Sequence, residues 1–150
     1  MTLRCKNSTG DNLQINQLLF EIKCHNILSE SLLWHEQEQA LYWTDIESKL
    51  LYKCEMTTEV ANILNADPLD TQSAIKKNEY LGQVLQVFDL PYRLGSFAFT
   101  NRCSTLIAGF ENGLAIYNYA TQETQWLTQT EVDANNVRFN NGKVDFQGDY

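Results

Sequence analysis

The chain has 150 residues, 43% of them hydrophobic, and a formal net charge of −8 at pH 7. That length suits one domain burying roughly 68 to 70% of its unfolded surface, and this composition excludes a disordered or collagen-like protein. The 19 acidic side chains outnumber the 11 basic ones. Because this excess repels phosphate backbones and anionic lipids, we expect neither nucleic acid nor a membrane surface as a partner.

Residues 1–17 form a polar N-terminal lead without the apolar core of a signal peptide. No run of about 18 apolar residues occurs anywhere in the chain. The four cysteines are scattered without a C-x-x-C pair, so neither zinc spacing nor a dense disulfide framework is indicated. These features predict a cytoplasmic protein.

Residues 18–150 contain a succession of β-strand patterns. Apolar and polar side chains alternate over residues 18–24, which predicts a strand there. Two hairpins are predicted over residues 41–52 and 105–117. The second contains an Asn112-Gly113 turn, a pair that permits positive φ.

The two predicted hairpins form an internal repeat with a constant offset of 65 residues. Residues 61–80 between them lack strand alternation and are interpreted as an inserted loop or short helix. Without this insertion the period is about 45 residues, the length of a four-stranded propeller blade. A third copy begins at residues 144–150, so we expect an all-β, propeller-like domain of about two to three blades with an open sheet edge. The aligned pairs are Trp34 over Phe99, Leu41 over Leu106, Tyr42 over Ile107, Leu51 over Ile116 and Tyr52 over Tyr117.

Glu30 is a single carboxylate within an otherwise apolar stretch. If it is buried, it must be paired, protonated or bound to a cation, so a metal ligand is one interpretation. The pattern alone favours the alternative, an exposed glutamate in a turn. Residues 45–49 are likewise interpreted as an inter-strand turn in preference to a ligand loop.

Residues 135–145 form the richest polar segment of the chain. Strand alternation places Arg138 and Asn140 on one face. Arginine offers a fork of donors to anionic or hydroxyl-rich ligands, and an asparagine oxygen can bind a hard cation or a sugar hydroxyl. The spacing alone slightly favours a simple hairpin that turns at Asn141-Gly142.

Five ordered motifs together resemble the gluconolactonase, senescence marker protein (regucalcin) and luciferin-regenerating enzyme family. The motifs are Ser-Glu-Ser-Leu-Leu-Trp at 29–34, Leu-Tyr-Trp-Thr-Asp-Ile at 41–46, Phe-Asp-Leu-Pro at 88–91, Ile-Ala-Gly-Phe-Glu-Asn-Gly-Leu at 107–114, and Val-Arg-Phe-Asn-Asn-Gly-Lys-Val-Asp at 137–145. The resemblance implies a six-bladed β-propeller and a hydrolase that opens sugar lactones to aldonic acids with a divalent metal, Ca²⁺ or Zn²⁺. It also implies that only the N-terminal half of such a protein is represented here.

The resemblance assigns roles to three residues. Glu30 matches the metal-binding glutamate of a Gly-Glu-Ser-Pro-x-Trp segment, although Ser29 and Leu32 replace the glycine and the proline. Arg138 and Asn140 match the substrate contacts of an Arg-Phe-Asn-Asp-Gly-Lys segment, in which an asparagine here replaces the aspartate.

The family's remaining metal ligands, an asparagine and a catalytic aspartate from later blades, have no counterpart in these 150 residues. We therefore expect no catalytic residue within the chain, and the isolated chain to be inactive. The alternative to a truncated lactonase is a non-catalytic propeller fragment that acts as a binding module or self-associates through its open sheet edge.

Overall fold

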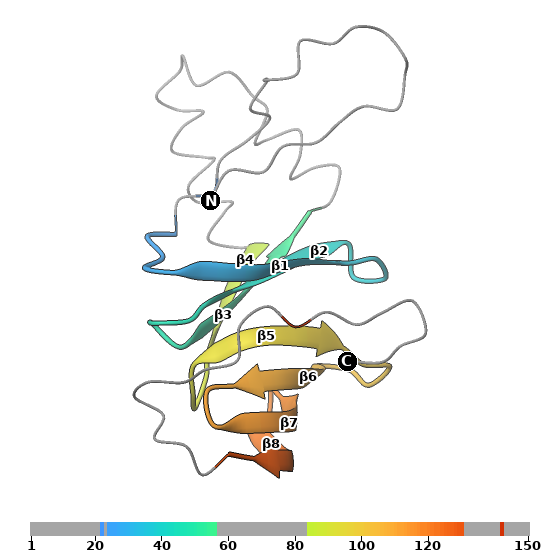
Figure 1. Ribbon diagram of the computed structural model, residues 1–150. Coiled ribbons are helices and arrows are strands. Elements are labelled where there is room, and N and C mark those ends of the chain that lie inside the picture. Colours follow the sequence, from blue (N-terminus) through green and yellow to red (C-terminus); the bar gives the residue numbers. More distant parts are fainter. Residues whose placement is uncertain (1–21, 23, 57–83, 131–141, 143–150) are drawn as a thin grey trace, which may run out of the picture.

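The computed structural model describes residues 22, 24–56, 84–130 and 142, which form two four-stranded antiparallel sheets (Figure 1). Each sheet is a meander in which strands adjacent in sequence are also neighbours in space. This is the blade-like, all-β architecture that the repeat predicts. No helix in these ranges is long and apolar enough to cross a membrane. The first sheet contains β1 (Ser29–His35), β2 (Ala40–Asp45), β3 (Leu50–Glu55) and β4 (Leu85–Asp89), and the second contains β5 (Leu94–Phe99), β6 (Thr105–Phe110), β7 (Gly113–Asn118) and β8 (Glu123–Gln129).

Both predicted hairpins are confirmed, as β2–β3 and β6–β7, but the predicted alignment of their second strands is wrong by two residues. Leu41 lies opposite Cys54, whereas the equivalent Leu106 lies opposite Tyr117. The offset is thus 106 − 41 = 65 in the first strands and 117 − 54 = 63 in the second. The reason is the turn, since four residues join β2 to β3 and two join β6 to β7.

The shorter turn depends on Gly113, which begins β7 with a φ of 150°. A Cβ atom at this position would lie 2.2 Å from the carbonyl oxygen of Thr128 in the neighbouring strand β8. The predicted Asn112-Gly113 turn therefore needs glycine for two reasons, the positive φ and the close approach of β8.

Of the predicted strand over residues 18–24, the structure describes only Ile22 and Cys24, and neither lies in a strand. The first described strand is β1, which runs through Glu30, so the alternative of an exposed turn glutamate is wrong. The insertion at 61–80 and the third copy at 144–150 lie outside the described residues.

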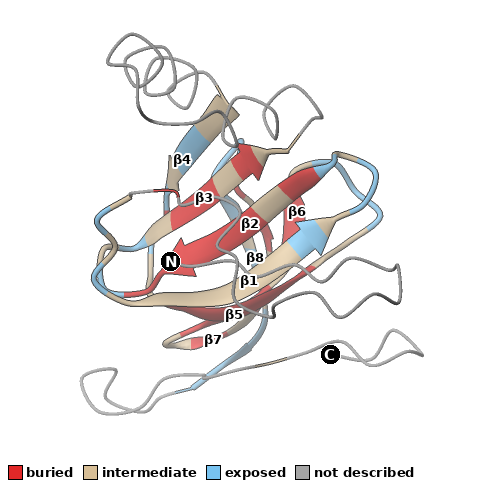
Figure 2. Cartoon of the chain, turned by 90° about the horizontal axis from the view of Figure 1, so that it is seen from above, coloured by how far each residue is buried: buried red, intermediate tan, exposed pale blue. Residues whose placement is uncertain are grey.

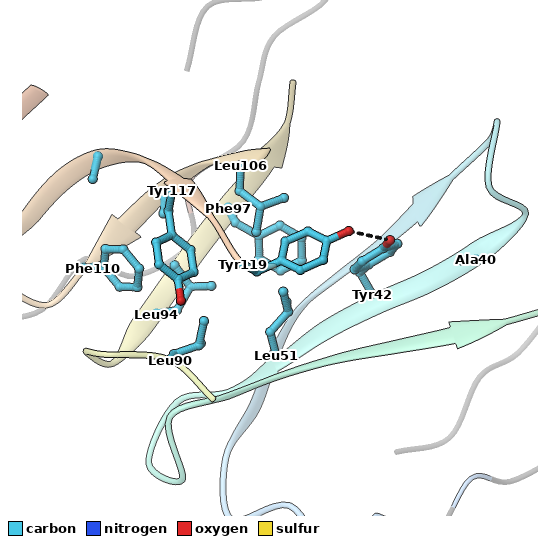
Figure 3. Close-up of a cluster of buried hydrophobic side chains, with 12 residues drawn as sticks. Ala40, Tyr42, Leu51, Leu90, Leu94, Phe97, Leu106, Phe110, Tyr117 and Tyr119 are labelled. Carbon is cyan, nitrogen blue, oxygen red and sulfur yellow. Dashed lines mark hydrogen bonds between the residues drawn. The ribbon is translucent and has the colours of Figure 1, made fainter. Parts of the chain in front are cut away.

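The main core lies between the two sheets, which pack face to face (Figures 1 and 3). Figure 2 shows buried residues along β2 and β5, and alternation in these strands sends one set of apolar side chains into the shared layer. Aromatic rings meet edge to face across it, as Tyr42 and Phe99 do with ring centroids 5.0 Å apart. The buried members are Ala40, Tyr42, Leu51, Leu90, Leu94, Phe97, Leu106, Ala108, Phe110, Ala115, Tyr117 and Tyr119.

A chain of hydrogen bonds joins the two sheets through this core. The hydroxyls of Tyr42 and Tyr119 lie 3.2 Å apart (Figure 3), and the Tyr42 hydroxyl donates to Oε2 of Glu38 over 2.5 Å. Since Tyr42 has one hydroxyl proton, Tyr119 is the donor between the two tyrosines. The Nζ atom of Lys53 lies 2.8 Å from the same carboxylate oxygen. We call Glu38, Tyr42, Lys53 and Tyr119 the inter-sheet relay.

The relay keeps Glu38 ionised although its surroundings are partly apolar. Burial by itself raises the pKa of the Glu38 carboxyl, but the hydrogen bonds from Lys53 and Tyr42 and the charge of Lys53 outweigh it and hold this pKa below its usual value. Burial, reinforced by the bond to Glu38, raises the pKa of the Tyr42 hydroxyl far above its ordinary value. At neutral pH the relay therefore contains the Glu38 carboxylate, the Lys53 ammonium and a neutral Tyr42 hydroxyl.

Tyr42→Phe is expected to destabilise the chain by about 1 to 2 kcal/mol, because it removes the hydroxyl that links Glu38 to Tyr119. Tyr117→Phe is the matched control. The buried Tyr117 hydroxyl has no hydrogen-bond partner among the described residues, so its removal is expected to be neutral or stabilising. Urea unfolding of both variants measures the difference, and an equal loss in the two would contradict the relay.

Glu38→Gln is expected to reduce the dependence of stability on pH. Because the Glu38 pKa is lower in the folded chain, its stabilisation is present above the unfolded value of about 4.3 and is lost as the pH falls through the folded value. The free energy of unfolding should therefore differ between wild type and variant by about 1 kcal/mol at pH 7, and the two curves should converge at acid pH. Curves that stay parallel down to acid pH would show that Glu38 does not titrate in this way.

Candidate functional site

Glu30 lies at the start of β1, opposite Thr44 in β2, and is half-buried. The β1–β2 register shifts between Glu30 and Leu33, and Ser31 within this bulge has a left-handed φ of 54°. Bulges bend a strand and re-aim its side chains, and they are frequent at functional sites. The Ser31 hydroxyl donates to the Gly95 carbonyl oxygen over 3.1 Å, so the bulge is attached to β5 of the second sheet.

The Glu30 carboxylate makes no hydrogen bond or ion pair within the described part of the chain. A half-buried carboxylate without a partner is suited to bind a cation. Hard cations such as Ca²⁺ take six to eight oxygen ligands. Residues 22, 24–56 and 84–130 contain no group of three His, Cys, Asp or Glu side chains that could hold a metal ion. Glu30 therefore fits the donor chemistry as one ligand of a larger set.

Arg138 and Asn140 lie outside the described residues. Their approach to Glu30, and their part in substrate binding, stay predictions.

Asp45 closes β2 near Glu30, and it is 1% exposed. Its carboxylate accepts hydrogen bonds from the Ser48 hydroxyl at 2.7 Å and from the amides of Ile27 and Leu28 at 2.9 and 3.0 Å. Burial by itself raises the Asp45 pKa, but these bonds outweigh it and hold that pKa below its usual value. The Asp45 carboxylate is thus engaged within the fold. The predicted inter-strand turn is confirmed over residues 46–49, while Asp45 itself is the last residue of β2.

The same end of the molecule has a second bridge between the sheets. The Arg93 Nε atom lies 3.5 Å from Glu47 Oε2 and 3.7 Å from Glu111 Oε2, and the Arg93 amide donates to Glu111 over 3.2 Å. Glu47 belongs to the β2–β3 turn and Glu111 to the β6–β7 turn. Arg93 therefore aligns the two turns near Glu30, although the partial exposure of the ion pairs limits their contribution to about 1 kcal/mol or less.

A cavity of about 290 Å³ lies between the sheets at the far end of β1. His35, Arg102 and part of the inter-sheet relay line it. The His35 Nδ1 atom accepts a hydrogen bond from the Glu38 amide at 3.2 Å, and the centroids of the His35 and Phe99 rings lie 4.5 Å apart. No sequence pattern reveals this cluster, because it depends on the β2–β3 register, which pairs Tyr42 with Lys53.

Comparison with known proteins relates the chain to one family throughout most of its length. The family described as the SMP-30/Gluconolactonase/LRE-like region matches residues 28–150. L-arabinolactonase of Azospirillum brasilense is 27% identical over 123 residues, which are 82% of this chain and 33% of that protein.

Two solved structures are also similar. A luciferin-regenerating enzyme has a TM-score of 0.57 at 15% identity, covering 82% of this chain and 34% of the other. A calcium-binding regucalcin from Agrobacterium tumefaciens strain C58 has a TM-score of 0.47 at 15% identity, covering 71% and 28%. The chain thus spans about a third of the length of the lactonase and of the luciferin-regenerating enzyme. Its two sheets match a portion of a six-bladed propeller. Because the family match covers most of the sequence, the chain belongs to the SMP-30/gluconolactonase/LRE-like family.

Proposed function

We propose that this chain is part of a divalent-metal-dependent lactonase that opens sugar lactones to aldonic acids, with Glu30 as a metal ligand. The observation that carries the proposal is the half-buried Glu30 carboxylate, which has no partner among the described residues and lies at a bulge beside the second sheet. The relationship to an L-arabinolactonase supports a sugar lactone as the substrate class.

The proposed roles of the chain's own residues follow from their chemistry. Glu30 holds the cation through one or both carboxylate oxygens. Arg138 orients the lactone by donating hydrogen bonds to its oxygens, and Asn140 contacts a hydroxyl or the cation. A bound divalent cation supplies Lewis-acid polarisation of the lactone carbonyl. Glu30 is not proposed as the base that activates water, since the resemblance places that aspartate in a later blade.

A second candidate function is a non-catalytic module that self-associates. On the face of the first sheet directed away from the second, Trp34 is 43% exposed and Val87 is 49% exposed. Large apolar side chains exposed on a sheet favour association. A monodisperse oligomer in size-exclusion chromatography, without metal-dependent turnover, would support this function over the lactonase.

Glu30→Gln is expected to weaken Ca²⁺ or Zn²⁺ binding by about tenfold or more, because a neutral amide replaces the ligand carboxylate. Isothermal titration calorimetry measures the change. Stability should hardly alter, since Glu30 has no partner to lose in the described part of the chain. Glu36→Gln, at an exposed glutamate just beyond β1, is the matched control and should bind metal as wild type does.

Hydrolysis of gluconolactone and arabinonolactone with added Ca²⁺ or Zn²⁺ tests the activity itself. We expect no metal-dependent rate from the 150-residue chain and a clear rate from a longer product of the same gene. Absence of turnover in both forms, or unchanged metal affinity in Glu30→Gln, would overturn the proposal.

A further inference from the structure

The segment that leads into Glu30 is held by a side chain from the neighbouring strand. Residues 26–28 precede β1 and have no ladder partner of their own in β2. Their backbone donors therefore need another acceptor. Asp45 provides it, because its two carboxylate oxygens accept from the consecutive amides of Ile27 and Leu28. The Ile46 amide returns a bond of 3.0 Å to the Leu28 carbonyl oxygen.

The carboxylate of Asp45 is itself fixed in position. It is almost fully buried, and the Ser48 hydroxyl donates to it from the β2–β3 turn. Asp45 is also the register partner of Ser29, the residue before Glu30. A charged acceptor with several donors forms stronger bonds than a neutral one, so the attachment is firm.

Glu30 thus lies between two attachments. Before it, Asp45 holds the entry to β1, and after it, the Ser31 hydroxyl holds the bulge to the Gly95 carbonyl of β5. Neither attachment uses the Glu30 carboxylate. The backbone of Glu30 is therefore fixed from both sides, while no other described residue engages its carboxylate oxygens, the arrangement that a preorganised ligand requires.

We infer that Asp45 is a positioning residue for Glu30: it holds the entry to β1 so that the Glu30 carboxylate has the geometry for binding a divalent cation. This inference rests on the proposed function. Asp45 does not itself contact the ligand, because its oxygens already accept bonds from Ile27, Leu28 and Ser48. Its effect on a cation passes through the backbone of β1.

Asp45→Asn tests the inference, since it keeps the size of the side chain but places an NH₂ donor where one of the backbone amides now donates. Ca²⁺ affinity is measured by calorimetry at pH 7, together with the free energy of unfolding in urea. Glu38→Gln is the matched control, because it weakens the fold at the opposite end of β1 without touching the entry to that strand. We expect Asp45→Asn to bind Ca²⁺ about tenfold more weakly than wild type, and Glu38→Gln to bind it within about twofold of wild type.

Affinity in Asp45→Asn that is unchanged, or reduced no more than in Glu38→Gln, overturns the positioning role while leaving the proposed function intact. If the 150-residue chain, with Glu30 as one ligand of a larger set, binds Ca²⁺ too weakly to measure, the same variants are compared in a longer product of the same gene that carries the later-blade ligands. Absence of Ca²⁺ binding in both wild-type forms overturns the proposed function and the inference with it. If Asp45→Asn does not fold, Ser48→Ala decides, because it removes one donor to Asp45 and leaves the two backbone bonds. A loss of about two- to fivefold in its Ca²⁺ affinity supports the inference, and an unchanged affinity overturns it.

Discussion

The burial of one face of each sheet against the other is the constraint on which the rest of the structure depends. A single four-stranded meander leaves two faces in water, and here the large side chains of both sheets, among them Tyr42, Phe97, Phe110 and Tyr117, fill one shared layer. Packing of this kind fixes how the sheets lie relative to each other. It also brings β1 beside β5, which allows the Ser31 hydroxyl to reach the Gly95 carbonyl and attaches the bulge next to Glu30.

Polar groups have different roles at the two ends of the packed pair of sheets. At the far end of β1, the inter-sheet relay engages the hydroxyl of Tyr42, the carboxylate of Glu38 and the ammonium of Lys53 with one another. At the near end, Asp45 holds the entry to β1, yet Glu30 keeps a carboxylate without a partner in the described residues. The hydrogen bonds of Asp45 and Ser31 therefore fix the backbone on both sides of Glu30 without using its carboxylate. This difference identifies the near end of β1 as the candidate site.

Much of the fold could be predicted from the sequence because local patterns determine it. Runs of apolar strand-forming residues identify both hairpins, the Asn112-Gly113 turn supports the second, and the repeat identifies the blade. The two-residue change in offset could not be predicted, since it depends on the length of the first turn, which only pairing across β2 and β3 reveals. The residue pattern alone favoured an exposed turn at Glu30, whereas Glu30 lies in β1, next to a bulge that the pattern does not reveal.

The candidate site was predictable in part. The family motif identifies Glu30, but no sequence pattern shows that it is half-buried beside a bulge attached to β5, or that no other described residue binds its carboxylate. The hydrogen bonds of Asp45 could not be predicted from the sequence either, because its partners Ile27 and Leu28 lie 18 and 17 residues away along the chain. The roles of Arg138 and Asn140 are still predictions from the motif alone.

Anomalous X-ray diffraction from crystals of the chain soaked in Zn²⁺ would show whether Glu30 binds a divalent cation. If Glu30 is a metal ligand, we expect a peak about 2.0 to 2.2 Å from a Glu30 carboxylate oxygen, the usual zinc–carboxylate distance. A zinc peak only elsewhere, for example in the cavity beside His35, with no density at Glu30, would contradict it.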